Sequence, residues 1–515
     1  MYHYFKNKMS AAFGANAEEP PEEAETAKKL SDNLLDNMVT LREKCRNTSD
    51  FMAREVTFAS IPMSMMAMEG LISLATLSKM ILPPLSEAAN RGVKTPQEMY
   101  DYIRTQTVIG MDVNDVYTTD EIFTFLMSGF AVILIDGMDK GVAIGVQGFS
   151  FRSVSEPSNE VNVRGSREGF TEPIRINLSM VRRRIKSPKL KFELFQLGSE
   201  SRTDVCMVYM TDIVDPKLLR DIRRKLKQIK LDVVLESGYI QPFLEGKPLS
   251  LFSDVGTTER PDTLCAKINE GRIAVLVDGT PFALIVPYLF SENFQSLDDY
   301  CHRPYYTTFI RILKYVSFFF TILLPGVYVG VGTFHPELFP HALLYNIASA
   351  EETTPLPLVL EALLIHFIYE VMREAGLRLP RPIGHAVSIV GALVIGDAAV
   401  TAGLIGAPMV MVVALTAISS FVVPSIYEPV AILRFAFIIL GGTTGLYGIT
   451  LGLTLVLFNM TRLNNFGVPY TAPISPFSLR AQRDVFYRAG WKKLGKHSAK
   501  IQHLSGVDIH ENLDQ

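Results

Sequence analysis

The chain has 515 residues, 48% of them hydrophobic and 20% charged, and a formal net charge of -3. So balanced a charge creates no global field that would attract nucleic acid, and we expect no nucleic-acid partner. The cysteines Cys45, Cys206, Cys265 and Cys301 show no CxxC spacing, so we expect free structural thiols in a reducing cytosol, no metal site and no cofactor.

The first part of the chain, residues 1–26, is predicted to be a disordered acidic lead-in, because it is polar and carries a Glu-Glu-Pro-Pro-Glu-Glu run from Glu18 to Glu23. It lacks the charged, apolar and small-residue order of a signal peptide, so we expect the soluble part of the protein to stay in the cytosol. A helix is expected from about Thr26 to Arg46, where leucines recur at helical spacing.

The soluble region contains two segments of similar pattern, residues 126–137 and 268–279. In each, a helix is expected to end at a glycine, a buried strand follows, and an Asp-Gly turn leads to a second strand. The sequence therefore predicts an α+β soluble region of two similar α/β subdomains, one at residues 27–165 and the other, with a linker helix, at residues 166–300. The expected helices are Asp120–Met127 and Asp262–Asn269, the expected second strands are Gly141–Val146 and Pro281–Val286, and the expected matching early strands are Glu55–Ala59 and Val205–Met210.

Three charged features of this region could be functional or purely structural. Asp136 and Asp278 of the Asp-Gly turns are either metal or acid groups, or residues that only form hairpins; the hairpin role is favoured because Asp-Gly is a strong turn signal. The basic run from Arg182 to Lys186 either faces anionic lipid headgroups or is a solvated helix end. Thr258–Asp262 is expected to begin the helix of the second subdomain.

From residue 315 onward the sequence is far more apolar. It predicts an all-α polytopic membrane domain at residues 301–461 and a basic cytosolic tail at residues 462–515, whereas no earlier window approaches the roughly 20 apolar residues that a helix needs to cross a bilayer. The long apolar stretches are Tyr315–Thr333, Ile383–Ala402, Met409–Pro424 and Phe435–Phe458, with a more amphipathic one at Pro357–Met372.

The distribution of basic residues sets the expected topology. Arg303, Arg311 and Lys314 place the start of the first stretch in the cytosol, and the basic residues after Phe458 place the tail there too. Because an odd number of crossings would put the tail outside, one segment is expected to be re-entrant. The glycine- and proline-rich segment 383–424 is the candidate, and this arrangement leaves only Arg434 on the unexpected side.

Ionisable residues inside apolar segments point to function. Glu361, His366 and Glu370 are the candidates for a polar face at membrane depth, with Glu374 just beyond. His366 and Glu370 share one helix face, and Glu361 does not share it closely. The face either lines a water-filled conduit or belongs to an amphipathic helix at the membrane surface. Asp397 is either an ion ligand or, as favoured, a helix cap.

The glycine-punctuated segment after Ile383 supplies the candidate pore lining. Small residues let helices from copies of the chain approach closely, and a ring of such helices would form an apolar constriction that gates by dewetting. The residues predicted to face this constriction are Val387, Ser388, Val390 and Val394. Helix packing alone explains the same pattern.

Two other function classes are disfavoured. A secondary transporter would need inverted repeats, and the apolar region has no internal symmetry. An enzyme would need a recognisable catalytic motif, but the sequence has no Walker motif, no GxSxG elbow and no zinc-ligand spacing. We therefore predict no catalytic and no metal-binding residue.

Several longer motifs occur in order along the chain. The soluble part carries Arg164-Gly-Ser-Arg-Glu-Gly-Phe-Thr-Glu172, Arg182-Arg-Arg-Ile185, Thr258-Glu-Arg-Pro-Asp262 and Gly271-Arg-Ile-Ala-Val-Leu-Val-Asp-Gly-Thr-Pro281. The membrane part carries Phe334-His-Pro-Glu337, Arg373-Glu-Ala-Gly376, Arg378-Leu-Pro-Arg-Pro-Ile-Gly384, Val390-Gly-Ala-Leu-Val-Ile-Gly396 and Phe466-Gly-Val-Pro-Tyr470. With these motifs the chain resembles the A subunit of GerA-type spore germination receptors from about residue 30 to residue 490. Ser166 departs from the family, which usually has proline there.

The resemblance implies a membrane subunit of a nutrient-responsive receptor in the spore inner membrane, in contact with its lipids and with the soluble domain on the core side. It implies a homo-oligomer, a pentamer in the family, that conducts cations when a germinant binds. The implied partners are a transporter-like B subunit and a lipoprotein C subunit. The alternatives are a non-conducting scaffold or regulatory subunit, including a sister branch that acts beside the dipicolinate channel, and, least favoured, a secondary transporter.

Overall fold

A computed structural model describes residues 28–88, 90–106, 112–148, 157, 160, 162, 164–247, 250–379, 396–477, 481–494, 500–504 and 506–507. The chain forms two compact units, which are described separately. The first is Met1–Cys45 with Phe51–Gly148, and the second is Arg46–Asp50 with Phe149–Gln515.

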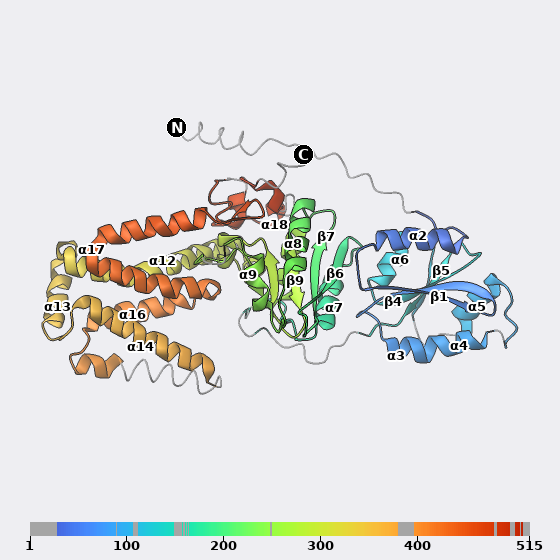
Figure 1. Ribbon diagram of the computed structural model, residues 1–515, viewed down its shortest axis with the longest axis horizontal. Coiled ribbons are helices and arrows are strands. Elements are labelled where there is room, and N and C mark those ends of the chain that lie inside the picture. Colours follow the sequence, from blue (N-terminus) through green and yellow to red (C-terminus); the bar gives the residue numbers. More distant parts are fainter. Residues whose placement is uncertain are drawn as a thin grey trace. The chain divides into compact units, whose positions relative to one another are not determined.

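The first unit is a five-stranded antiparallel sheet in the order β1-β2-β4-β5-β3. The run Phe-Ala-Val-Ile-Leu-Ile of β4 is buried at every position, because helices cover both faces of the sheet (Figure 1). The strands are β1 (Phe51–Phe58), β2 (Ile61–Met68), β3 (Val113–Val116), β4 (Phe130–Ile135) and β5 (Gly141–Gly145), and the main helices are α2 (Leu34–Lys44), α4 (Leu82–Glu87), α5 (Pro96–Gln106) and α6 (Thr119–Leu126).

The second unit begins with a sheet of the same design, in the order β6-β7-β9-β10-β8. Helices α7 and α10 pack on one face of this sheet, and α8 and α9 pack on the other. The prediction of two similar α/β subdomains is therefore confirmed. The strands are β6 (Leu190–Leu197), β7 (Thr203–Met210), β8 (Gly256–Thr258), β9 (Ile273–Val277) and β10 (Ala283–Val286), and the helices are α7 (Ile174–Arg184), α8 (Pro216–Gln228), α9 (Gln241–Leu244) and α10 (Pro261–Asn269).

The expected match between two early strands is wrong. Glu55–Ala59 lies mostly in β1, and the position of β1 at the sheet edge corresponds to β6. The strand that corresponds to β7 is β2, since each of them pairs with the buried central strand of its sheet. The sequence showed this correspondence only in part. Met66–Glu69 and Met207–Met210 lie at nearly the same offset from their Asp-Gly turns, but the start of β2 was not apparent because Ala59 and Ser60 form a tight turn with positive φ of 50° and 64° without the usual glycine or asparagine.

Each Asp-Gly turn also caps a helix far away in the sequence. Oδ1 of Asp136 accepts a hydrogen bond from the backbone N–H of Leu34 (3.1 Å), at the start of α2. Oδ1 of Asp278 accepts one from Ile174 (2.9 Å), at the start of α7. A carboxylate at a helix N-terminus satisfies an unpaired N–H and interacts favourably with the helix dipole. These contacts give both aspartates a structural role in addition to the turn.

The basic run at the end of α7 is paired inside the protein. Arg182 is buried and forms a bidentate ion pair with Asp50 (2.8 and 3.0 Å). Arg183 and Arg184 both bind Glu168, and the pKa of Glu168 is lowered because these two arginines outweigh its partial burial. The three arginines therefore form ion pairs within the protein, while Arg184 and Lys186 are also exposed to solvent, as expected at a helix end.

The rest of the second unit is helical. Its long elements are α12 (Pro304–Phe334), α13 (His341–Glu351), α14 (Leu358–Arg378), α16 (Ala407–Ser420) and α17 (Tyr427–Thr461). In the described residues, α12 and the segment Pro424–Thr461 are long and apolar enough to cross a membrane, and α16 is a shorter apolar helix. The predicted helical region after the sheets is thus confirmed, and most of the expected stretch Ile383–Ala402 lies outside the described residues.

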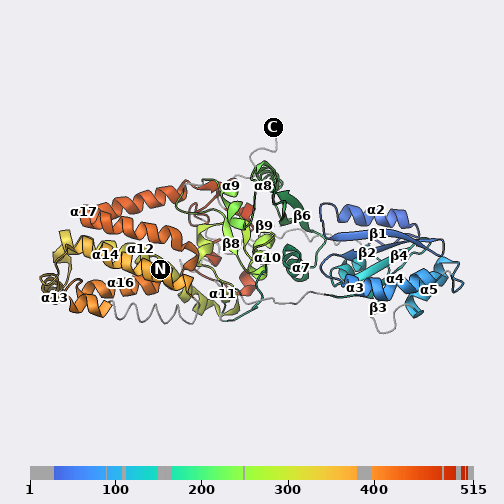
Figure 2. The same cartoon turned by 60° about the horizontal axis from the view of Figure 1, so that its bottom comes forward.

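Helices α12 and α17 lie side by side in both views, and α13 lies at the end of the bundle remote from the second sheet (Figures 1 and 2). Their close approach depends on glycine: a methyl group on Gly441 would lie 2.2 Å from the carbonyl oxygen of Gly326. One turn further on, α17 is interrupted at Gly445, whose φ is 65° and ψ is -148°. Side chains with a Cβ rarely adopt such a φ.

The segment after α17 folds back onto the second sheet subdomain. The backbone N–H of Phe290 donates to the carbonyl of Tyr470 (2.8 Å), and that of Ile501 donates to the carbonyl of Glu270 (2.9 Å). Ile501 is buried beside Leu289 and Val468. The described residues of the basic tail are therefore part of the folded core of the second unit.

Candidate functional site: buried charges in the helical region and at its base

The predicted pore-lining residues Val387, Ser388, Val390 and Val394 lie outside the described residues, so their role stays a prediction. The described part of the helical region contains two clusters of buried charge. One lies inside the bundle, on α14 and α17, and the other lies where the bundle meets the second sheet subdomain.

Inside the bundle, Arg434 on α17 pairs with Glu370 on α14. The Arg434 side chain is 0% exposed, and its Nη1 lies 3.0 Å from Oε1 of Glu370. Its Nε also donates to the carbonyl of Thr321 on α12 (3.2 Å), and the hydroxyl of Tyr427 donates to Glu370. One ion pair thus joins three helices, and removing one partner of such a buried pair costs about 3–5 kcal/mol.

The other predicted polar residues of α14 are also buried. His366 is 0% exposed, and its Nδ1 lies 2.9 Å from the carbonyl of Ala362. A carbonyl can only accept, so this contact places the proton on Nδ1 and leaves Nε2 as an acceptor. Glu361 is 1% exposed, and its Oε1 accepts a hydrogen bond from the backbone N–H of Gly406 (2.6 Å).

The expected grouping of the α14 acids needs correction. Glu361 and His366 lie on the buried side of the helix together with Ala362 and Ile365. Glu374, which the spacing placed beside Glu370, is half-exposed and pairs with Arg378. The buried side is broad because α12, α16 and α17 all pack against α14, so it includes Glu361 as well as His366.

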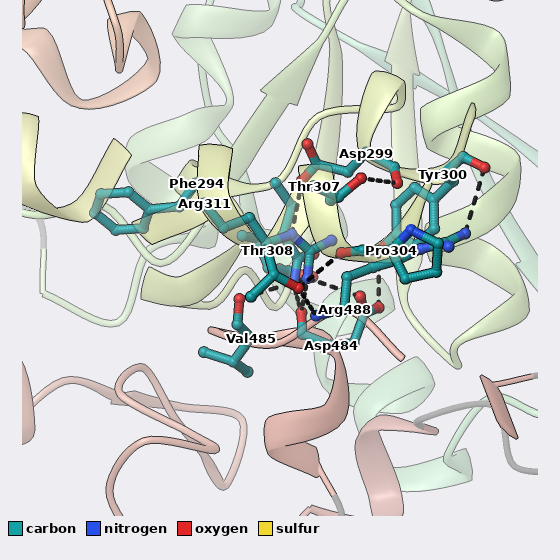
Figure 3. A network of polar contacts seen from close by, with 12 residues as sticks. Phe294, Asp299, Tyr300, Pro304, Thr307, Thr308, Arg311, Asp484, Val485 and Arg488 are labelled. Carbon is teal, nitrogen blue, oxygen red and sulfur yellow. Dashed lines mark hydrogen bonds and ion pairs between the residues drawn. The ribbon is translucent and has the colours of Figure 1, made fainter. Parts of the chain in front are cut away.

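At the base of the bundle, Arg311 on α12 is the centre of the second cluster (Figure 3). This side chain is 0% exposed; its Nε donates to Asp299 (2.7 Å), and its Nη1 donates to Asp484 (2.9 Å). Asp299 lies in the short helix α11 (Asp298–Cys301) just before α12, and Asp484 lies in the C-terminal segment. Arg311 therefore ties the start of the first long helix to segments on both sides of the bundle.

Further contacts make this junction a network. The hydroxyl of Tyr300 donates to Asp484 (2.8 Å), and that of Thr307 donates to the carbonyl of Asp299 (2.9 Å). The backbone N–H of Arg488 donates to the hydroxyl of Thr308 (3.2 Å). Burial, reinforced by the negative charge of Asp484, raises the pKa of Tyr300 well above its usual value, so this phenol stays a donor at every physiological pH.

A third group of charges connects the junction to the sheet. Glu292 is buried and binds both Lys267 of α10 and Arg272, each at 2.5 Å. Burial alone would raise the pKa of Glu292, but Arg272 and Lys267 outweigh it and the pKa is lowered. Next to it, Phe294 stacks on Tyr315 of α12 with ring centroids 3.9 Å apart. The end of the second sheet subdomain and α12 therefore share one core.

The outer surface of the helices is apolar. Exposed large apolar side chains include Phe309, Ile312, Val316, Phe319 and Phe320 on α12, Phe367 and Val371 on α14, Met411 and Ile418 on α16, and Ile432, Ile439, Leu451, Leu455 and Phe458 on α17. With Arg311, Arg434, His366 and Glu361 inside and these residues outside, the helical region has the reverse of the usual polarity of a soluble domain.

The sequence indicated some of these residues and missed their partners. In the sequence, Arg434 was only an exception to the expected topology, whereas the structure pairs it with Glu370. The sequence feature that could have predicted this pair is the presence of two charges of opposite sign in separate apolar segments. The partners of Arg311 gave no signal, because Asp484 lies 173 residues away. In the described residues, no group of three or more His, Cys, Asp or Glu side chains is placed to hold a metal ion.

Comparison with known proteins gives a consistent picture. Residues 39–499 match the family model described as "Bacillus/Clostridium GerA spore germination protein". The chain is 39% identical to "Spore germination protein KA" of Bacillus subtilis over 475 residues, which cover 91% of this chain and 87% of that protein. It is 37% identical to "Uncharacterized membrane protein YfkQ" of the same organism over 465 residues, 90% of each chain. A solved structure, the N-terminal domain of the A subunit of the Bacillus megaterium spore germinant receptor GerK3, is similar over 52% of this chain and 98% of its own, with 30% identity and a TM-score of 0.42.

Proposed function

The chain belongs to the Bacillus/Clostridium GerA family of spore germination proteins, and on that premise we propose that it is the membrane subunit of a nutrient-responsive germination receptor. In this proposal several copies assemble around an axis, a pentamer by resemblance. Their helices retain cations in the dormant spore and release them when a germinant binds. The location is the spore inner membrane, with the sheet subdomains on the core side.

The observation that carries this proposal is the reversed polarity of the helical region. Large apolar side chains cover α12, α14, α16 and α17, while Arg434 and His366 are enclosed between these helices and Glu370, the partner of Arg434, is partly buried. Lipid accepts the first group, and ionisable residues enclosed at membrane depth are a common feature of ion pathways. This pattern favours a membrane-embedded bundle with a polar interior.

The junction at Arg311 supports a role for the sheets in gating. A displacement of the second sheet subdomain would act on Asp299 and Phe294, which contact α12 directly. The same displacement would act on the C-terminal segment through Asp484. Because buried ion pairs hold a defined geometry, such a junction passes motion from the soluble part to the bundle.

The pore itself is proposed to be lined by Val387, Ser388, Val390 and Val394. Apolar side chains around a narrow axis exclude water and ions until the ring widens. A transporter-like B subunit that binds the nutrient and a lipoprotein C subunit are the proposed partners. The competing proposal is a scaffold or regulatory subunit that transmits the state of a partner and conducts nothing.

Ion retention in dormant spores tests the proposal. We expect Val387→Ala and Val390→Ala each to widen the constriction, so that spores lose potassium without a germinant. Val371→Ala is the matched control, because Val371 lies on the exposed side of α14. Normal potassium retention in both pore variants would show that these residues do not line a pore, and would favour the scaffold or regulatory role.

A further inference from the structure

At the end of the bundle remote from the sheets, two carboxylate groups lie near one another, and no ion pair with a basic side chain is found for either among the described residues. Glu361 on α14 and Glu351 at the end of α13 lie close enough to interact electrostatically. Gly406 makes the proximity concrete: a methyl group built there would lie 3.4 Å from Oε1 of Glu361 and 3.6 Å from Cβ of Ala350. Tyr328 of α12 lies within reach of both acids.

Each acid retains an oxygen that nothing in the described residues satisfies. Oε2 of Glu361 and Oε1 of Glu351 are both buried and have no hydrogen-bond partner there. The Glu361 side chain is almost completely enclosed, with an exposed fraction of 1%. A buried carboxylate oxygen without a partner costs about 1–3 kcal/mol or more, so a further group beyond the described residues is expected at this point.

The backbone around Glu361 offsets part of the cost of burying its carboxylate. Its Oε1 accepts from the N–H of Gly406, the N-cap of α16 (Ala407–Ser420), so the carboxylate lies at the positive end of this helix. Hydrogen bonding to the charged form favours ionisation. One oxygen is thus held by the helix and the other is left free to bind a ligand.

The local charge distribution leaves room for a cation. The sequence has no lysine or arginine between Lys314 and Arg373, or between Arg381 and Arg434. The nearest arginine on the bundle interior, Arg434, is already bound to Glu370, which lies nine residues beyond Glu361 and therefore about 13 Å along α14. Two neighbouring ionised carboxylates in a low-dielectric space are strongly unfavourable unless a cation or a proton neutralises them.

We infer that Glu351 and Glu361 form a binding site for a divalent, oxygen-seeking cation of the Ca²⁺ type. Carboxylate oxygens are the ligands that such hard cations prefer, and two of them neutralise a divalent charge. Water and backbone carbonyls complete the coordination, so the affinity is weak, with a dissociation constant on the order of 10⁻⁴ to 10⁻³ M. The cation binds in the resting protein, so this inference does not depend on whether the protein conducts ions.

Calcium binding to the purified full-length chain in detergent tests this inference. We expect saturable binding of Ca²⁺ by isothermal titration and a rise of Tm with added CaCl₂. Both Glu361→Gln and Glu351→Gln should weaken binding at least about tenfold, since each removes one of the two charges. Glu352→Gln, which changes an exposed neighbour by the same charge, should leave the affinity within about twofold.

Three outcomes would overturn the inference. The first is no saturable Ca²⁺ binding by the unsubstituted chain. The second is unchanged binding by Glu351→Gln, which decides the matter even if Glu361→Gln fails to fold, because Glu351 is only half-buried. The third is a rise of Tm on acidification, without any rise on addition of Ca²⁺, that is absent in Glu361→Gln. This result would mean that the site binds a proton. If the unsubstituted protein binds Ca²⁺ but conducts no ions, that result would count against the proposed function and leave this inference intact.

Discussion

Arg311 and Asp484 lie 173 residues apart in the sequence and form a buried ion pair at the base of the helical bundle, with Nη1 and Oδ1 2.9 Å apart. Asp299 holds the Nε of the same guanidinium. The first long helix, the end of the sheet subdomain and the C-terminal segment therefore meet at one side chain. We propose this junction as the physical basis for coupling the sheet subdomain to the helical bundle.

Substitution of Arg311 tests the junction. Arg311→Ala removes the central cation from Asp484, which is partly exposed, and from the buried Asp299, which keeps a longer contact with Lys314 (3.6 Å). We therefore expect a loss of about 3 kcal/mol in the free energy of unfolding. Arg303→Ala, at an exposed arginine one residue before the same helix, should change it by no more than about 0.5 kcal/mol. Thermal unfolding of the purified proteins in detergent measures both, and equal effects of the two substitutions would show that the pair is dispensable.

A double-mutant cycle tests the pair inside the bundle. Glu370→Gln leaves the buried Arg434 without its carboxylate and is expected to cost about 3–5 kcal/mol. Arg434→Gln should cost less, about 1–3 kcal/mol, because Glu370 is partly exposed and also lies 3.8 Å from Arg373. The double variant removes both charges, so its loss should be smaller than the sum by at least about 1 kcal/mol. Strict additivity in the unfolding free energies would contradict the contact between Glu370 and Arg434.

The ion pairs of Glu292 predict that the second sheet subdomain loses stability at acid pH. Because its pKa is lower in the folded than in the unfolded protein, its contribution is fully present above the unfolded value, near 4.3, and is lost as the pH falls through the folded value. Glu292→Gln should lower Tm at pH 7, since Lys267 and Arg272 lose the buried one of their two carboxylate partners and keep only Glu270. The difference in Tm between the two proteins should shrink below about pH 4, and a difference that is constant with pH would exclude this assignment.

Gly441 tests the close packing of α12 and α17. A methyl group there would lie 2.2 Å from the carbonyl oxygen of Gly326, so we expect Gly441→Ala to separate the helices and to cost about 1–3 kcal/mol. Gly396→Ala is the matched control, because the nearest atom to its added methyl group lies 3.8 Å away. It should be neutral or slightly stabilising, since alanine is the better helix former.

The sequence predicted the fold well where local patterns determine it. The repeated Gly-strand-Asp-Gly pattern led directly to two similar sheets, because these elements depend on neighbouring residues. The strand β2 was missed, since Pro62 and Ser64 interrupt its apolar run and its turn at Ala59 and Ser60 has no glycine. The pairing of early strands failed with it.

The candidate site was predicted only in part, for a similar reason. The charges on α14 were visible as ionisable residues in an apolar segment. Their partners Arg434 and Gly406, and the triad of Arg311, Asp299 and Asp484, come together only in the tertiary fold. No periodicity in the sequence reports such contacts, and the tail that carries Asp484 has a basic composition typical of a free cytosolic extension.

The most direct test of the central claim is potassium flux from liposomes that contain the purified chain. We expect the unsubstituted protein to retain potassium, Val390→Ser to release it at a rate at least about tenfold higher because a polar ring no longer excludes water, and Val371→Ser, on the exposed side of α14, to behave as the unsubstituted protein does. Equal retention by Val390→Ser and Val371→Ser would contradict an ion path lined by this segment.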